Sequence, residues 1–405
     1  MASVSAFAQS SVSITGVIDA GYTTVNVDKN GTAKYAGIAN NGVSTSGFFF
    51  KGTEDLGGGM SAIFLTELDF NPVISNTANQ NSSSASYAGA VYNGTPFNGE
   101  QYVGLQGGFG SVKVGTPNSP ALDTSSTSQP FGTALGSGYS SSFGRLGTGS
   151  ASGLIQYVGA EGSTGRIIRS EKAVVYTSPV YSGVTAQVEW SPQNDRGGYT
   201  ANDNGVLGLS AKYNQGPLNV QLYNGKASAG AIAAAGSNTL ANLAASPVVF
   251  SAGKLPANAS TTWNMLGANY TVGATTYFAG YTTTKTDGVT TVKVLEDNKS
   301  WNVGAKYVMG KIDLLANYLV RKSNLTESQA FDTSNGQYAD TAKLLGLGAN
   351  YNFSKTSSVY YRYEAISGLN AAATTQTALT NGVAGVGNYG DAKSVKQMVG
   401  LRVAF

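Results

Sequence analysis

Extended segments in which apolar residues alternate with small or polar residues recur along the whole chain. In 394–405, Val399, Leu401 and Val403 share one face, and the residues between them are small or charged. The same alternation marks 204–213, 300–309 and 342–353. A period of two is typical of a strand whose two faces meet different media, and no helical period recurs. The pattern therefore predicts an all-β protein.

About sixteen segments qualify as strands, each near the ~9–11 residues that cross a bilayer at a tilt. They lie at 12–22, 43–53, 60–71, 99–107, 110–116, 168–178, 183–191, 204–213, 217–228, 261–271, 275–285, 299–308, 311–322, 342–353, 357–367 and 394–405.

The connections between these segments alternate in length. Short connections with turn chemistry lie at 55–59, 107–110, 178–183, 215–217, 272–274, 309–311 and 354–356. Long ones lie at 23–42, 72–98, 117–167, 192–203, 229–260, 286–298, 323–341 and 368–393. Long loops at one rim and short turns at the other are typical of a transmembrane antiparallel β-barrel of the outer-membrane kind. An even strand count in a closed barrel places both termini on the short-turn side, which is the periplasmic side, and leaves no unpaired edge.

Composition supports a barrel and narrows the function. Only 12% of the 405 residues are charged, while Gly (53) and Tyr (23) are abundant. No apolar run reaches the 18 residues of a spanning helix. The 25 basic and 22 acidic residues are too balanced to indicate nucleic-acid binding. Cys and His are absent, which excludes disulfides, thiolate ligands, His-based triads and His-ligated zinc, so we predict no cofactor and no metal site.

The start of the chain and the strand ends carry weaker signals. Ala6, Phe7 and Ala8 before Gln9 are similar to the end of a secretory signal peptide. We therefore expect 1–8 to be a signal remnant or a disordered terminus, and 9–405 to be one barrel; an arbitrary loose terminus is the alternative. Aromatic residues near strand ends predict an interfacial girdle, with ordinary β-propensity as the alternative. They are Tyr176, Tyr213, Tyr270, Tyr307, Tyr351 and Phe405.

Three stretches, 52–64, 102–115 and 399–405, resemble the general porins of beta-proteobacteria, the neisserial and burkholderial type. The opening 13–21 also fits. The alternating end with Leu401, Val403 and Phe405 resembles the outer-membrane assembly signal, which makes the barrel assembly machinery an expected partner.

The resemblance implies a sixteen-stranded homotrimeric barrel in contact with outer-membrane lipid. It also implies a third loop folded into the pore, and the longest connection, 117–167, is that loop here. Its Pro130, Phe131 and Gly132 resemble the constriction of the family. A disordered loop is the alternative.

Alternation selects the charges that face the lumen, because Arg or Lys on the lipid face at mid-bilayer costs roughly 2–4 kcal/mol. The basic candidates are Lys51, Lys113, Arg166, Arg169, Arg362 and Arg402, and the acidic ones are Glu67, Asp69, Asp123 and Glu364. Phe49 is a further candidate for the constriction. For each residue, a solvated lumen charge without special influence is the alternative. In porins of this type, basic residues of the wall face acids of the inserted loop and create a transverse field.

Two departures affect the expected selectivity. Similar porins carry Arg where this chain has Gly47 and Thr116. Part of the basic cluster is therefore missing, although Arg169 matches a basic position of the family. Lys51, Lys113, Arg166 and Arg169 compensate in part, and Phe49 is expected to narrow the passage or make it apolar. We expect a weak preference for anions.

The sequence thus predicts an outer-membrane diffusion porin for small hydrophilic solutes and ions, and not an enzyme. A substrate-specific channel for a small organic acid is the alternative in the same class. A surface adhesin that uses the long loops is the alternative from a different class. A membrane enzyme is disfavoured, because no nucleophile–base pair can be named without His.

Overall fold

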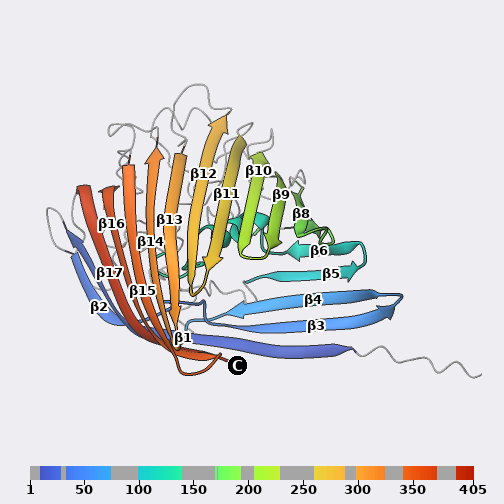
Figure 1. Ribbon diagram of the computed structural model, residues 1–405, viewed down its shortest axis with the longest axis horizontal. Helices are drawn as coiled ribbons and strands as arrows, with labels where there is room; N and C mark the ends of the chain where they lie inside the picture. Colours follow the sequence, from blue (N-terminus) through green and yellow to red (C-terminus); the bar gives the residue numbers. More distant parts are fainter. Residues whose placement is uncertain are drawn as a thin grey trace, which may run out of the picture.

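The computed structural model describes residues 10–28, 33–73, 99–138, 169–170, 172–192, 205–228, 260–287, 298–323, 341–371 and 389–405. Within these ranges the chain forms seventeen strands and one helix, and all strands join one antiparallel sheet (Figure 1). Among the same residues, no helix is long and apolar enough to cross a membrane.

The strands follow one another around the sheet in chain order. Their bounds are β1 Ser11–Asp28, β2 Ala33–Asn40, β3 Gly47–Gly57, β4 Met60–Asp69, β5 Gln101–Gly107, β6 Gly110–Thr116, β7 Ala173–Thr177, β8 Val184–Ser191, β9 Gly205–Gln215, β10 Leu218–Ser228, β11 Ser260–Val272, β12 Thr275–Asp287, β13 Asn298–Met309, β14 Ile312–Ser323, β15 Thr341–Asn352, β16 Ser357–Ala371 and β17 Tyr389–Ala404. The helix is α1, Pro120–Ser128, between β6 and β7.

The first and last strands close the sheet into a barrel. β1 pairs with β17 from Val17 opposite Ala404 to Asp28 opposite Lys393. The other edge of β1 pairs with β3 along its first part and with β2 along its second part. Because β2 and β3 thus take up one place, the seventeen strands fill sixteen places, and the predicted sixteen-stranded antiparallel barrel is confirmed.

The clearest differences from the sequence prediction concern β1, β2 and α1. β1 continues to Asp28 and β2 lies in the stretch expected to be a loop, since the inward–outward alternation persists there, with Thr23 and Val25 buried and Tyr22 exposed. α1 was not predicted, because its apolar residues have no helical period. Its signals are local: the hydroxyl of Ser119 accepts a hydrogen bond from the Ala121 amide at 3.2 Å, and Pro120 occupies the first turn.

The alternation along the strands sorts side chains as predicted. In β9, Leu207 and Leu209 are about half exposed on the outer face, whereas Val206 is 4% exposed on the inner face. Of the aromatic residues predicted for the girdle, Tyr213, Tyr270, Tyr307, Tyr351 and Phe405 are exposed beside the short turns. An outer surface this rich in exposed apolar side chains fits contact with lipid acyl chains rather than water.

The seam between β1 and β17 ends in a specific packing contact. Gly16 and Phe405 exchange two backbone hydrogen bonds, of 2.8 and 3.0 Å. The Phe405 ring lies over Gly16, where an added Cβ would be 2.5 Å from the ring carbon Cζ. Phe48 of β3 meets the same ring edge-on, with the ring centroids 5.9 Å apart. A side chain at position 16 would therefore displace the ring that covers the seam.

We expect Gly16→Ala to lower the thermal stability of the folded barrel, because the Phe405 ring must move away from the new methyl group; since this ring is partly exposed, the cost should lie near or below the lower end of the about 1–3 kcal/mol found for overpacked cores. The melting temperature in detergent and the heat-dependent mobility shift on gel electrophoresis measure this. Gly108→Ala is the matched control, since an added Cβ at Gly108 meets nothing within 4 Å. Equal melting temperatures for the two variants would show that the packing of the Phe405 ring does not require glycine at position 16.

Candidate pore and its constriction loop

The segment that follows β6 lies inside the barrel, along one side of its inner wall. α1 packs against the inner face of β9, β10, β11 and β12, and in Figure 1 it lies behind these strands. Residues 129–138 continue the path to β16 and to the 41–46 connection. We call residues 117–138 the inner loop. They are the described part of the predicted constriction loop 117–167.

A buried carboxylate holds the start of the inner loop. Glu189 on β8 is fully buried and accepts hydrogen bonds from the hydroxyls of Ser119 and Ser170, both at 2.8 Å. The hydroxyl of Tyr223 donates to the same group at 3.4 Å. The sequence analysis did not select Glu189, although it faces inward between two outward-facing apolar residues, Val188 and Trp190.

Amide side chains from successive strands continue the attachment. Each of four inward-facing amides donates its side-chain NH2 to a backbone carbonyl of the inner loop. Gln221 donates to Pro120 at 3.3 Å, Asn269 to Thr127 at 3.0 Å, Asn302 to Ser128 at 2.6 Å and Asn317 to Gly136 at 3.4 Å. These contacts bind the backbone of the inner loop to the wall and help to satisfy its buried carbonyls.

The far end of the inner loop has two further backbone contacts. The Gly136 amide donates to Glu364 at 3.1 Å, and the Leu135 amide donates to the Gly42 carbonyl at 3.1 Å. Asp19 on β1 in turn accepts the amides of Val43 and Ser44 at 2.7 and 2.8 Å, and the hydroxyl of Tyr360. The 41–46 connection is thereby fixed where it meets the inner loop.

Glycines on the inner face provide the space for this packing. An added Cβ would be 2.2 Å from the Thr124 carbonyl oxygen at Gly267, and 2.2 Å from the Gly136 carbonyl oxygen at Gly346. At Gly304 it would be 2.7 Å from Pro130. These glycines touch the inner loop, so this part of the wall is covered by the loop.

Apolar side chains of the inner loop point to the wall. Phe131 is 5% exposed and packs with Ala134 and Leu315. Leu135 packs with Ala39, Tyr360 and Met398. The inner loop is therefore held by buried apolar contacts as well as by hydrogen bonds, and it packs on the wall as a continuous layer.

Five residues predicted for the pore and its constriction belong to this packed layer. Phe131 turns to the wall, and the Arg362 guanidinium lies 5.7 Å from its ring centroid. Arg362 and Glu364 face inward as alternation predicted, but they are 2% and 0% exposed under the loop. Pro130 contacts the wall at Gly304, and Gly132 forms a left-handed turn with φ +59°. Alternation along β16 predicted that Arg362 and Glu364 face inward, but it could not predict that the inner loop covers them.

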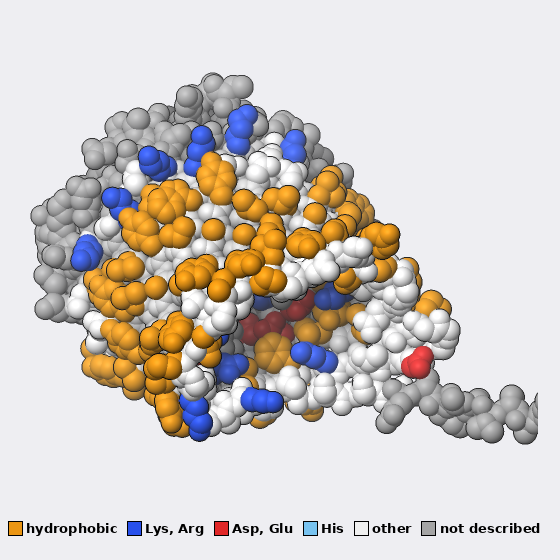
Figure 2. Space-filling view, viewed as in Figure 1, with side chains coloured by type: hydrophobic (Ala, Val, Ile, Leu, Met, Phe, Trp, Pro, Cys, Tyr) orange, Lys and Arg blue, Asp and Glu red, His pale blue; other side chains and the backbone are white. Residues whose placement is uncertain are grey.

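The opposite side of the lumen stays uncovered. In α1, Asp123 and Ser126 are the exposed residues, and they point away from the strands that the helix packs on. Figure 2 shows a hollow in which acidic side chains lie between Lys and Arg side chains. Its other wall is the inner face of β3–β6, where Phe49, Lys51 and Lys113 lie as predicted. The uncovered part of the lumen thus lies between α1 and β3–β6, and we refer to it as the passage.

Two cations of this wall lie beside aromatic rings. The Lys51 ammonium is 5.7 Å from the Phe49 ring centroid, and the Lys113 ammonium is 4.3 Å from the Tyr102 ring centroid. Register places Lys51 opposite Leu65, and Leu65 opposite Tyr102, so the two pairs lie on neighbouring parts of one surface.

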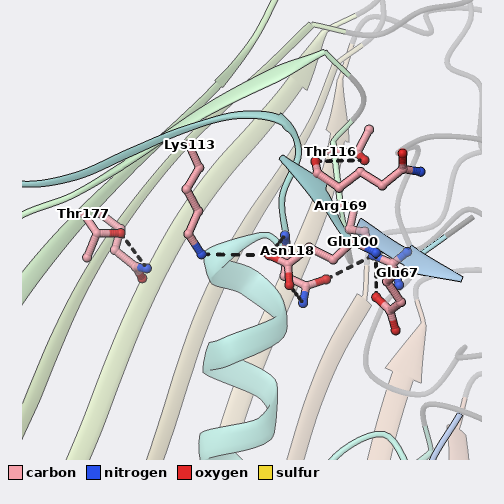
Figure 3. A network of polar contacts seen from close by, with 9 residues as sticks. Glu67, Glu100, Lys113, Thr116, Asn118, Arg169 and Thr177 are labelled. Carbon is pink, nitrogen blue, oxygen red and sulfur yellow. Dashed lines mark hydrogen bonds and ion pairs between the residues drawn. The ribbon is translucent and has the colours of Figure 1, made fainter. Parts of the chain in front are cut away.

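A network of polar contacts joins the wall to the root of the inner loop (Figure 3). Glu100 accepts hydrogen bonds from the backbone amide and the side-chain amide of Asn118, both at 3.0 Å. The Arg169 Nε donates to the Asn118 side chain at 3.0 Å, and the Lys113 ammonium lies 4.0 Å from Glu100. Glu67 accepts the Glu100 backbone amide at 2.6 Å. The predicted residues Lys113, Arg169 and Glu67 therefore meet in one cluster, through Glu100 and Asn118, which the sequence analysis missed.

Asp123 carries the negative charge of the inner loop into this passage. The surrounding barrel removes water from the carboxyl group and raises the pKa of Asp123 above its usual range, while Lys212, Lys113 and a hydrogen bond from Gln187 act in the opposite direction. The carboxylate of the inner loop thus lies within the electrostatic influence of Lys212 on β9 and Lys113 on β6.

The remaining predicted residues are less central to this cluster. Arg402 donates to the Ser44 hydroxyl at 2.7 Å, near the 41–46 connection. Asp69 lies at the end of β4, opposite Gly47 on the inner face, and is buried. Leu401, Val403 and Phe405 are exposed on the outer face of β17. Arg166 and the segment 1–8 lie outside the described residues.

Comparison with known proteins decides the family. The sequence model of the Gram-negative porins matches residues 1–371. The chain belongs to the Gram-negative porin family. Its barrel, closed by antiparallel strands and narrowed by an inner loop, is an outer-membrane β-barrel.

Individual relatives of this porin agree with that assignment. Outer membrane porin protein 32 of Delftia acidovorans is 29% identical over 221 residues, which is 52% of this chain and 55% of that protein. The match thus spans little more than half the length of this relative. Among solved structures, an anion-selective porin from Comamonas acidovorans has a TM-score of 0.69 at 20% identity, and 98% of this chain covers 100% of that one. The trimer form of OmpT from Vibrio cholerae has a TM-score of 0.58 at 15% identity, with 98% and 99% covered.

We expect Gly346→Ala to loosen the inner loop of the porin, because the new methyl would overlap the Gly136 carbonyl. The variant should lose about 1–3 kcal/mol of stability, and its single-channel current should be noisier than that of the wild type. Leu347→Ala, on the outer face of the same strand, is the control, since its side chain points away from the loop. If the single-channel current of Gly346→Ala is as quiet as that of the wild type, Gly346 is not needed to hold the inner loop.

Proposed function

We propose that this porin is a passive diffusion channel for small hydrophilic solutes and ions. The observation that carries the proposal is the position of the inner loop, which fills one side of the lumen and leaves a charged hollow along β3–β6 (Figure 2). Diffusion needs only a hydrated passage whose narrowest part sets the size and charge preference. The family and the fold are those of channels, which supports a transport function over catalysis.

We further propose a weak preference for anions. The acids of the cluster are bound up in hydrogen bonds: Glu100 accepts two from Asn118, and Glu67 accepts one from a backbone amide. The Lys51 side chain is exposed on the wall of the passage. Cations that reach into the passage act on a solute more strongly than carboxylates that are held by donors. A structural neighbour described as anion-selective is consistent with this preference.

The assembly and the orientation are part of the same proposal. A structural neighbour in trimer form supports a homotrimer. We infer that both termini face the periplasm, since β1 begins and β17 ends at the rim that carries the short turns (Figure 1). The exposed outer side chains of Leu401, Val403 and Phe405 suit recognition of β17 by the barrel assembly machinery before lipid covers them.

We expect Asp123→Asn to increase the preference for chloride over potassium, since it removes a negative charge beside Lys113 and Lys212. The reversal potential in a potassium chloride gradient across a planar bilayer measures this. Acidification should shift the wild type in the same direction, because protonation also neutralises Asp123, and the raised pKa starts the shift at a higher pH than for an ordinary carboxyl group. In Asp123→Asn, the change of the reversal potential that comes from protonation of Asp123 should be absent. If Asp123→Asn has the same reversal potential as the wild type, Asp123 does not contribute to ion selectivity.

A second candidate function is a channel with a binding site for a small organic acid. It is favoured by the two aromatic–cation pairs, Phe49 with Lys51 and Tyr102 with Lys113. Such pairs suit a solute that combines a planar apolar body with a carboxylate, because the ring packs on the aromatic face and the carboxylate meets the ammonium. Aromatic carboxylates are the solutes this surface fits best.

We expect benzoate to reduce the single-channel current at concentrations at which acetate does not. Phe49→Leu should weaken the block by roughly three- to tenfold, because a ring contact is worth about 0.5–1.5 kcal/mol beyond its buried area. Acetate is the control for charge alone, and Phe50→Leu, on the outer face of β3, is the control for the substitution. Equal effects of benzoate and acetate would leave only the general diffusion channel.

A further inference from the structure

Lysine side chains form a band on the outer surface, at the end of the strands that carries the long connections. Figure 2 shows basic side chains in an arc along this edge of the apolar surface. On β10–β15 the band consists of exposed, outward-facing lysines, one on each strand except β11. They are Lys226, Lys285, Lys299, Lys322 and Lys343, and we call them the lysine band.

The register of the strands makes these lysines neighbours. Lys226 and Lys285 both stand opposite Thr262, on either side of β11. Lys299 stands directly opposite Lys322, and Lys343 is opposite Val320, one outward position below Lys322. With about 4.8 Å between adjacent strands, five positive charges span roughly 24 Å of the barrel surface.

Aromatic residues fix the level of the band in the membrane. On β13 the outward residue below Lys299 is Trp301, whose ring packs with Tyr318 of β14 at 5.9 Å between centroids. Trp and Tyr mark the boundary between acyl chains and headgroups. Two residues of strand add about 7 Å, and a lysine side chain extends its ammonium further toward water. The lysine band therefore lies at the level of the lipid headgroups.

Two lysines of the band, Lys299 and Lys322, stand directly opposite each other. Like charges directly opposite each other destabilise a strand pair, and Lys299 and Lys322 are such a pair. On β13, β14 and β15, none of the outward side chains that the structure describes is a carboxylate. At the other rim, the exposed lysines of the described short turns, Lys311 and Lys355, stand apart from each other on different turns. The charge is thus concentrated at one leaflet.

We propose that the lysine band binds the phosphate-bearing headgroups of anionic lipid in the leaflet on the long-connection side. Phosphate complements the charge of the band, and headgroups occupy its level in the membrane. A row of five lysines matches several adjacent headgroups better than one isolated ion. Acyl chains of the same lipids would cover the exposed apolar residues directly below, such as Leu222 and Leu345.

The test compares two variants of equal charge in the full-length protein. Lys299→Gln with Lys322→Gln removes the opposed pair, and Lys311→Gln with Lys355→Gln removes two charges at the other rim. Each protein is purified in neutral detergent, and binding of phosphatidylglycerol and of diphosphoryl lipid A is titrated, with phosphatidylcholine as the uncharged reference. Native mass spectrometry counts the bound lipids, and it also reports the oligomeric state.

We expect the wild type and the turn variant to bind the anionic lipids alike, with an affinity that falls as salt rises. The band variant should bind them on the order of tenfold more weakly, with unchanged binding of phosphatidylcholine and unchanged conductance. Equal binding of anionic lipid by the two variants would overturn the proposal. It would also be overturned if the band variant kept its lipid but lost its oligomer, because the band would then be an interface with a second copy of the chain.

Discussion

The whole structure depends on the need of every backbone N–H and C=O group to find a partner where water is absent. In a membrane-spanning sheet, edge strands cannot be left open, so the first and last strands must meet. Pairing of β1 with β17 and the exchange of backbone hydrogen bonds between Gly16 and Phe405 meet this need. Once the ring is closed, side chains can only point to lipid or to the interior, and the alternation in the sequence follows from this.

Closure also creates an interior that must be divided between packing and passage. The inner loop fills one part of this interior. Amide side chains of β10, β11, β13 and β14 bind its backbone carbonyls, and glycines of the wall let the backbones of loop and wall approach each other. Glu189 and Glu364 attach the two ends of the segment. The loop is thus held by the strands it covers, and the strands β3–β6 carry the side chains of Phe49, Lys51 and Lys113 on their inner face.

The sequence predicted the features that depend on a single strand with one face toward lipid and the other toward the barrel interior. Strand positions, barrel closure, the outer apolar face and the inward direction of Lys51 and Lys113 follow from the period of two, whereas Arg169 lies before β7 in an isolated bridge with Asn118. It did not predict α1, which has capping residues but no apolar period. It placed Phe131, Arg362 and Glu364 at the eyelet, since alternation tells which face a residue occupies but not whether another segment lies on that face. Glu189 and Glu100 were missed because their partners are distant in the sequence.

The uneven attachment of the inner loop has a consequence for how this porin can change during evolution. A substitution in the part of the wall that the inner loop covers affects many contacts at once, because the amides, glycines and buried acids there all contact the same segment. Among the described residues, hydrogen bonds from β3–β6 and the residues beside them reach the inner loop at its start, where Glu100 binds Asn118. Phe49 and Thr116 can therefore be exchanged there with little effect on the inner loop, and a lineage can change the lining of this wall while its barrel and its inner loop stay the same.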